Sequence, residues 1–180
     1  MVRTKDMIEG KKITLRDKDP SDAWDDYSWE TDPELSRLDA APVYQIPYSQ
    51  YLMDYTIDLR TPRTSSRQFA VDTLDGKHIG NCSYYNLDKY RGEVEIGIMI
   101  GDRDYWNKGY GMDIITTLVE HIFTQINVDR VHLKTLDWNA RAQKCFQNCG
   151  FAECNRMSRE GYNFIQMEIL RKGWESQPRD

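Results

Sequence analysis

The segment from residue 94 to residue 126 constrains the fold of this chain more than any other stretch. Apolar side chains occupy alternate positions from 94 to 100, which is the periodicity of a β-strand. From residue 112 to residue 126, apolar side chains recur at helical spacing over about four turns. Residues 106–111 lie between the two patterns and include two glycines. The sequence therefore predicts a strand, a glycine-bearing loop and a long helix in direct succession.

The start of the predicted helix is suited to binding an anion. The backbone N–H groups of a first helical turn lack partners, and the helix dipole adds about half a positive charge there. Gly109 and Gly111 would let a ligand approach the main chain, and Lys108 adds a full charge. This arrangement favours a phosphate, with an ordinary loop before a helix as the alternative. The loop matches neither the Gly-x4-Gly-Lys-Ser/Thr motif nor the complete three-glycine dinucleotide fingerprint.

A second informative segment, residues 139–151, follows a predicted strand at residues 131–136. Asn139 is a favourable residue to cap the start of a helix, and Gly150 is typical of the position just past a helix end. One face of this helix is small or apolar: Ala142, Cys145, Phe146 and Cys149. The sequence thus predicts a second strand–helix unit directly after the first.

Together these two segments resemble the signature of the general N-acetyltransferase (GNAT) superfamily. Residues 106–111 resemble its motif A, Gln/Arg-x-x-Gly-x-Gly/Ala, and residues 139–151 resemble its motif B, Asn-x-x-Ala-x-x-x-Tyr-x-x-x-Gly-Phe. The two motifs in this order are more specific than either alone. The resemblance covers residues 93–151 and is closest to the branch that holds ribosomal-protein N-terminal and spermidine acetyltransferases.

The resemblance implies an α+β fold, a GNAT-like three-layer domain. Its sheet would be mixed, mostly antiparallel and of about six or seven strands, with helices on both faces. Turn signals at residues 75–77 and 159–161 predict hairpins that agree with such a sheet. We expect a single domain over residues 1–172, followed by a disordered polar tail at 173–180.

Acetyl-CoA is the cofactor that the resemblance implies, and the activity is acetyl transfer to a primary amine by direct attack in a ternary complex. The pyrophosphate of coenzyme A would bind main-chain N–H groups of residues 107–112. The pantetheine arm would pair with residues 98–100 as an added strand, with Gly97 permitting a bulge that separates this strand from the next. The cofactor-binding residues implied are Ile98, Met99, Ile100, Trp106, Asn107, Lys108, Gly109, Tyr110, Gly111, Met112, Asn139 and Phe146.

Catalysis requires a neutral amine, because an ammonium group has no lone pair for attack. Deprotonating a polyamine-like amine with a pKa of about 10.4 at pH 7 costs about 4–5 kcal/mol, against about 1–1.4 kcal/mol for a peptide N-terminus. Glu95 on the central strand is the candidate base, ahead of Glu93 and Asp137, with a solvated carboxylate on a half-exposed strand as the alternative. Asn139 is the second candidate catalytic residue and would hydrogen-bond the pantetheine or the acceptor.

The sequence departs from the family pattern at two positions. Trp106 stands where motif A has Gln or Arg, and Phe146 stands where many members place a tyrosine near the coenzyme sulfur. A phenyl ring cannot protonate the departing thiolate. Water, the acceptor's own proton or another tyrosine would then do so, and the candidates are Tyr84, Tyr85 and Tyr162.

Composition limits the partners. A net charge of -5 argues against a general nucleic-acid binder, and no apolar run is long enough for a signal sequence or a membrane span. The four cysteines lack metal-site spacing, so we expect no metal and a cytoplasmic location. The expected partner is a small-molecule amine or a peptide N-terminus, with a homodimer as an option common in the family.

Two other functions remain open at this point. The chain could be a non-catalytic acyl-CoA-binding domain, or a structural domain whose glycine loop binds nothing. The acceptor is also open among peptide N-termini, polyamines, aminoglycosides and amino sugars, because its pocket would be built from the N-terminal third, where the resemblance is weakest.

Overall fold

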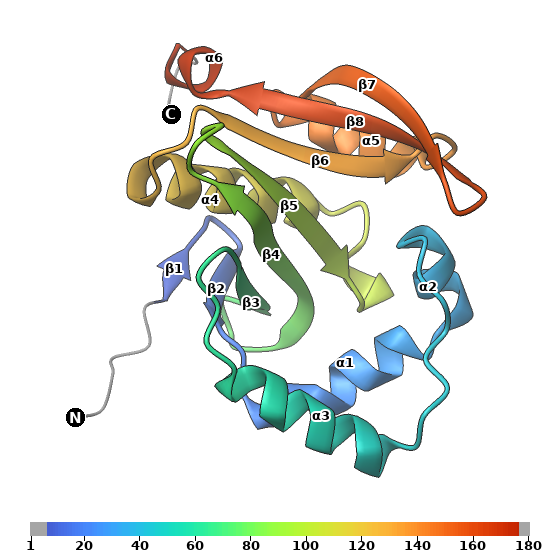
Figure 1. Cartoon of the computed structure of the whole chain (residues 1–180). Coiled ribbons are helices and arrows are strands. Elements are labelled where there is room, and N and C mark those ends of the chain that lie inside the picture. The colour runs from blue at the N-terminus through green and yellow to red at the C-terminus, as the bar shows by residue number, and fades with distance from the viewer. Residues whose placement is uncertain (1–6, 177–180) are drawn as a thin grey trace.

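A single mixed sheet organises the computed structural model, which describes residues 7–176 (Figure 1). Within these residues the sheet has eight strands in the order β1-β2-β3-β4-β5-β6-β8-β7. The strands are β1 (Ile8–Glu9), β2 (Ile13–Asp17), β3 (Arg67–Thr73), β4 (His78–Asp88), β5 (Glu93–Ile100), β6 (Arg130–Leu136), β7 (Ala152–Arg159) and β8 (Tyr162–Leu170). The helices are α1 (Ala23–Glu30), α2 (Pro33–Leu38), α3 (Tyr48–Arg60), α4 (Tyr110–Gln125), α5 (Ala140–Asn148) and α6 (Arg171–Glu175), with 3-10 turns η1 (Pro20–Asp22) and η2 (Arg103–Tyr105).

The predicted fold class is confirmed, with one strand more than expected. The pairs are antiparallel except β5 with β6. The additional strand, β1, pairs with β2 through Ile8 opposite Leu15. A strand of two residues is too short to show any periodicity, so the sequence gives no signal for it.

The strand–loop–helix unit forms as predicted, and its alternation separates the two sides of the sheet. Val94 and Ile96 of β5 join the core with the buried face of α4, which includes Ile114 and Leu118. Of the intervening positions, Gly97 and Met99 line a cavity together with residues of α1 and α2, so this part of the central strand has helices on both sides. In Figure 1, α4 and α5 lie together on one side of the sheet, and α1, α2 and α3 gather apart from them.

Strands β5 and β6 are parallel neighbours for a short distance only. They pair from Glu93 opposite Arg130 to Glu95 opposite His132, and beyond that point β5 has β4 as its only partner in the described sheet. The bulge expected at Gly97 is wrong, because β5 pairs with β4 in unbroken register from Glu95 to Ile100. The separation arises where the parallel pairing ends, and it leaves one edge of β5 open.

Helix α1 packs directly on the end of β5. Gly101 follows this strand, and a Cβ atom placed on it would lie 2.0 Å from Cδ2 of Trp29. Any side chain at position 101 would therefore overlap the Trp29 ring. The indole ring also lies against His78 of β4, with ring centroids 5.0 Å apart. Trp29 thus fixes α1 against the ends of the two central strands.

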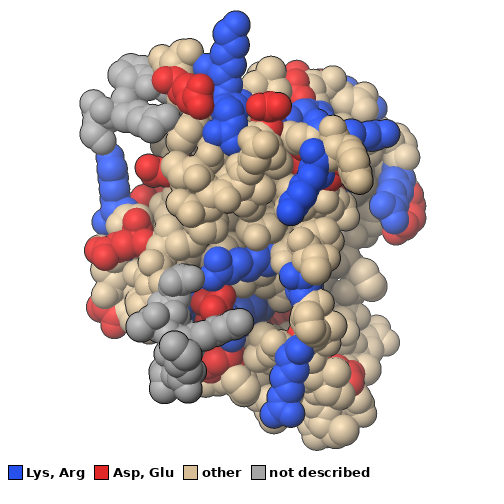
Figure 2. Space-filling view, turned by 60° about the vertical axis from the view of Figure 1, so that its left-hand side comes forward, with Lys and Arg blue, Asp and Glu red and all other residues tan. Residues whose placement is uncertain are grey.

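The C-terminal segment is partly helical. Residues 171–175 form α6, where the Trp174 ring packs against Phe123 with centroids 5.0 Å apart. The predicted disordered tail began at residue 173, and its last four residues, 177–180, lie outside the described residues. Within residues 7–176, no helix has the length and apolar content to cross a membrane. The face shown in Figure 2 carries Lys and Arg side chains interspersed with Asp and Glu.

Candidate active site

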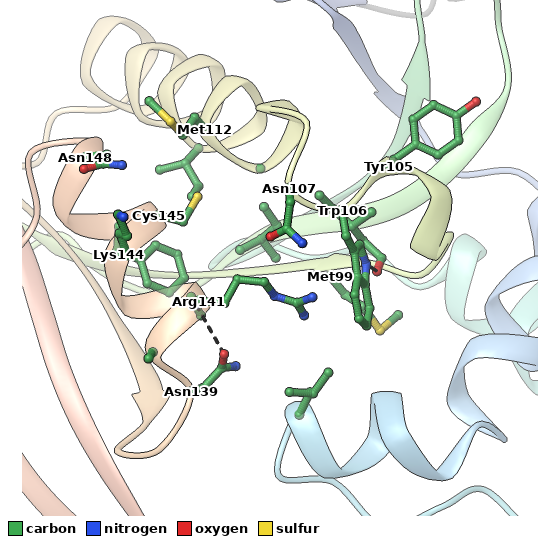
Figure 3. A pocket seen from close by; sticks show the side chains of 18 of the residues that line it. Met99, Tyr105, Trp106, Asn107, Met112, Asn139, Arg141, Lys144, Cys145 and Asn148 are labelled. Carbon is green, nitrogen blue, oxygen red and sulfur yellow. Dashed lines mark hydrogen bonds between the residues drawn. The ribbon is translucent and has the colours of Figure 1, made fainter.

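A cavity of about 670 Å³ lies among the loop after β5, the start of α4, helix α5 and helix α2 (Figure 3). Arg103 in η2 links two of these walls, because its guanidinium contacts Asp32 at 2.9 Å and Glu34 at 2.8 Å at the start of α2. Most of the predicted cofactor-binding residues line the cavity: Ile98, Met99, Ile100, Trp106, Asn107, Gly109, Gly111, Met112, Asn139 and Phe146.

Two of the predicted cofactor-binding residues do not line this cavity. The carbonyl of Lys108 accepts a hydrogen bond from Lys12 Nζ at 2.8 Å. The Tyr110 ring packs edge-on against Tyr105, with centroids 4.9 Å apart. Neither side chain is among the residues that line the cavity, and both residues belong to the backbone segment 107–112 beside it.

The backbone of this loop presents a run of unpaired amides. Within the described chain, no residue accepts a hydrogen bond of normal geometry from the amides of residues 107–112. The run is bounded by the Trp106 amide, which donates to Arg103 O at 3.1 Å, and the Asp113 amide, which donates to Gly109 O at 3.2 Å. Asn107 and Gly109 have φ angles of 57° and 84°, and left-handed residues beside right-handed ones turn successive N–H groups into an anion-binding concavity.

Two cations on α5 complete the positive side of the cavity. Arg141 and Lys144 both line it, and the Arg141 guanidinium carbon lies 3.7 Å from the centre of the Trp106 ring. Trp106 is itself fixed, because its indole N–H donates to Ile100 O at 2.8 Å. Desolvation lowers the pKa of Arg141. The motif comparison did not single out either cation, although their i, i+3 spacing just after Asn139 places them on one helix face.

The start of α5 is held as the sequence predicts. Asn139 Oδ1 accepts a hydrogen bond from the Ala142 amide at 3.2 Å, so its side-chain NH₂ group stays available to the cavity (Figure 3). One turn later, Cys145 lies against the glycine loop, because a Cβ atom on Gly111 would be 3.3 Å from its sulfur. Phe146 is 6% exposed and packs against Phe151. The close approach of Cys145 to Gly111 brings α5 against the start of α4.

Glu95 is buried and paired. The alternative to a catalytic Glu95, a solvated carboxylate on a half-exposed strand, does not hold, since Glu95 is 4% exposed. One carboxylate oxygen lies 2.9 Å from Lys134 Nζ and the other accepts from Asn86 at 3.2 Å. Glu95 is not among the residues that line the cavity. It is a paired carboxylate between β5 and β6, below the point where these strands separate.

On the opposite side of Ile98 and Met99 lies a second cavity, of about 430 Å³. Tyr85 and Gly97 belong to its wall, and the Tyr85 hydroxyl would be 3.9 Å from a Cβ atom on Gly97. Burial, together with the charge of Glu95, raises the pKa of Tyr85, so its hydroxyl stays protonated. Of the other two candidate acids, Tyr84 packs on Phe69 and Tyr162 on Phe164, and neither lines any of the cavities described here.

The second cavity continues into a third, of about 470 Å³, between α1 and α3. Four residues line both: Lys18, Glu30, Tyr44 and Gln68. The third cavity adds two more tyrosines, Tyr51 and Tyr55, and two more carboxylates, Asp54 and Asp58. Its ionised groups are thus mainly negative, in contrast to the cavity beside α4. Among residues 7–176, no cluster of three or more metal-ligating side chains is present.

Comparison with known proteins gives a consistent result. A family model described as an acetyltransferase (GNAT) domain matches residues 12–152. An uncharacterized N-acetyltransferase, p20 of Bacillus licheniformis, is 24% identical over 142 residues, which are 78% of this chain and 79% of that protein.

Solved structures share the fold at low sequence identity. Spermidine N-acetyltransferase from Vibrio cholerae, solved with CoA and spermine, has a TM-score of 0.81 at 18% identity, over 91% of this chain and 98% of that one. The aminoglycoside acetyltransferase AAC(6')-Ib, solved with ribostamycin and coenzyme A, has a TM-score of 0.79 at 18% identity, over 94% and 99% of the two chains.

Proposed function

The chain belongs to the acetyltransferase (GNAT) family and is an acetyl-CoA-dependent N-acetyltransferase, and from that premise we propose that its acceptor is a small molecule carrying more than one amine. The observation that supports this acceptor is the continuous change of charge across the site. The cavity beside α4 has unpaired amides and two cations with one carboxylate, whereas the two cavities beyond Ile98 and Met99 have several carboxylates with one lysine.

The first cavity fits coenzyme A. Its six unpaired amides, together with Arg141 and Lys144, would hold the pyrophosphate, since charge-assisted hydrogen bonds to phosphate are the strong ones. The open edge of β5 at residues 98–100 would pair with the amide groups of the pantetheine arm. The side-chain NH₂ of Asn139 would donate to the same arm or to the acceptor. Acetyl-CoA supplies the activated acetyl group.

The carboxylates fit a cationic acceptor. Three of them, Asp39, Glu30 and Asp54, form no ion pair with any described residue. Glu30 accepts from the Tyr51 hydroxyl at 3.0 Å and Asp54 from Gln50 at 2.9 Å. The one lysine on this route, Lys18, already contacts Asp26 at 2.6 Å.

Tyrosine rings in the third cavity strengthen this preference, because aromatic faces attract alkylammonium groups. In a molecule with two distant amines, one amine could react beside Ile98 and Met99 while the other binds the carboxylates and tyrosines of the third cavity. A peptide N-terminus carries a single cation and would leave the outer carboxylates unmatched. The spermine and ribostamycin bound by the two structural neighbours are both small molecules with several amines.

The acceptor is tested with a triamine, an alkyl monoamine of the same length, an aminoglycoside and a short peptide. The release of the coenzyme thiol and the mass of the product would be followed for each. We expect kcat/KM for the polyamines to exceed that of the monoamine at least tenfold. Asp54→Asn should lower kcat/KM for the triamine and leave the monoamine value unchanged.

Two outcomes would contradict the proposal. A peptide acetylated faster than every polyamine would reassign the acceptor to a polypeptide N-terminus. Coenzyme binding without turnover of any amine would instead indicate a domain that only binds acyl-CoA.

A further inference from the structure

Asp39 lies at the junction between two cavities: the one beside α4, which is the cofactor cavity, and the second one, lined by Tyr85 and Gly97, which is the proposed acceptor cavity. The two cavities share four lining residues, Leu35, Asp39, Ile98 and Met99, and Asp39 is the only ionisable one. It is also the only carboxylate among the residues that line the cofactor cavity. Because Ile98 and Met99 border both cavities, this is the place where an acyl group from one side can meet an amine from the other.

The backbone of Asp39 is fixed while its carboxylate is free. Asp39 ends α2, and its amide donates to Leu35 O at 3.0 Å. No described residue forms a hydrogen bond or an ion pair with its carboxylate, which is exposed to the space of the cavities. The surrounding walls still desolvate it, and this raises the pKa of Asp39. The charged and titratable residues that line the acceptor cavity beside it are Lys18, Glu30, Tyr44, Cys82 and Tyr85. Those that line the cofactor cavity are Tyr105, Arg141, Lys144 and Cys145.

We propose that Asp39 is the general base of the acetyl transfer, which accepts a proton from the acceptor amine beside Ile98 and Met99. The inference rests on the proposed function and replaces the base expected from the sequence. Glu95 is held by Lys134 and Asn86 and does not line the cavity, so taking up a proton would cost it the ion pair with Lys134. Asp39 has no such contact to lose.

Protons and bonds balance with Asp39 in this role. The acceptor enters as R–NH₃⁺ and loses two protons on becoming the amide. Asp39 takes the first proton, which frees the nitrogen lone pair. The bond from nitrogen to the acetyl carbon then forms as the carbon–sulfur bond breaks, and the departing thiolate takes the second proton. Asp39 returns its proton to the solvent of the acceptor cavity.

The test compares Asp39→Asn, Asp39→Glu and the control Glu120→Gln, which alters an exposed carboxylate on α4 away from the cavities. We expect Asp39→Asn to lower kcat/KM at pH 7 by about 10²–10⁴-fold, the range of general-base catalysis. The thermal shift with coenzyme A should equal that of the unaltered protein. Asp39→Glu should recover part of the rate, and Glu120→Gln should keep all of it.

The pH profile and the pKa of the acceptor separate a base from a structural residue. The loss in Asp39→Asn should shrink as the pH approaches the acceptor pKa, because the amine is then neutral without help. It should also be smaller for an acceptor amine of pKa about 8 than for one of about 10.4. A structural defect would lower kcat/KM by the same factor for both acceptors and at every pH.

Three results would overturn the inference. Unchanged kcat/KM and pH profile in Asp39→Asn would exclude Asp39 as the base and leave the proposed function standing. A lost coenzyme shift in both Asp39 variants would show that the residue shapes the cofactor cavity instead. If the unaltered protein acetylated none of the amines, the proposed function would fail, and the inference would fail with it.

Discussion

Gly109 shows how much the cofactor cavity depends on a single backbone conformation. Its φ of 84° lies in the left-handed region, and it directly precedes the first residue of α4. A side chain here would be strained by about 1–2 kcal/mol. It would also start 3.5 Å from Lys12 Nζ, within the run of unpaired amides at residues 107–112.

Gly109→Glu should abolish coenzyme A binding, because it adds a negative charge where the pyrophosphate is proposed to lie. Coenzyme at a hundred times Kd should stabilise the unaltered protein by about 2.7 kcal/mol and the variant by nothing measurable. Gly161→Glu is the matched control: its φ is 82°, and no atom lies within 4 Å of its added Cβ. Calorimetric unfolding with and without coenzyme measures both, and retained binding in Gly109→Glu would place the phosphate site elsewhere.

Helix α5 is connected to the loop after β5 by a stacked contact. Arg141 lies 3.7 Å from the centre of the Trp106 ring and so connects α5 to the loop that carries the unpaired amides. This contact explains how the site accommodates a tryptophan where the family motif has Gln or Arg. The aromatic face fixes a guanidinium beside the proposed phosphate position.

Arg141→Ala should weaken coenzyme A binding about tenfold to a hundredfold, since a charge-assisted hydrogen bond contributes about 1.5–3 kcal/mol. Isothermal titration at two salt concentrations measures the change, and the salt dependence of Kd should decrease with the lost charge. Arg156→Ala is the control, because Arg156 is an exposed arginine on β7 that pairs with Glu153. Equal affinities for the two variants would contradict a phosphate contact from Arg141.

Elements could be predicted from the sequence where the pattern is local. The alternation in β5, the apolar stripe of α4 and the Asn139 cap of α5 are each encoded within one stretch, and the structure confirms all three. The surroundings of Glu95 could not be predicted, because its partner Lys134 comes from β6. Asp39 gave no signal for a related reason: it ends a six-residue helix and reaches the cavities only through tertiary packing.

At the scale of the whole molecule, a buried ionic cluster joins α1 to the sheet beneath the acceptor cavity. Asp26 is fully buried, and its carboxylate contacts Lys18 at 2.6 Å, Asn81 at 2.6 Å, Tyr55 at 2.8 Å and His78 at 3.4 Å. Burial alone would raise the pKa of Asp26, but the contacts with His78, Lys18 and Asn81 outweigh it and hold the pKa at about 2. Burial opposes protonation of His78 as well, yet the contact with Asp26 raises its pKa above 6.5.

These two pKa shifts predict that the free energy of unfolding falls at both ends of the pH range, at acidic pH because of Asp26 and at alkaline pH because of His78. The contribution of Asp26 is present above its ordinary pKa of 3.8 and is lost as the pH falls towards 2, which removes about 2 kcal/mol. The contribution of charged His78 is present below pH 6.5 and is lost as the pH rises through the raised pKa. Urea unfolding at pH 5 and pH 9 tests the second limb: His78→Gln should cost more stability at pH 5 than at pH 9. An equal cost at both values would show that His78 is neutral in the folded protein.

The close packing of Trp29 on Gly101 limits which substitutions this fold can accept at these two positions. The residues proposed to select the acceptor lie on α1, α2 and α3, whereas those proposed for the cofactor follow β5. The two sets meet where the Trp29 ring packs on the backbone of Gly101. A chimera that imports another protein's acceptor helices must therefore bring a residue at position 29 that suits a glycine at 101, or exchange both together. Positions 29 and 101 can therefore change only together.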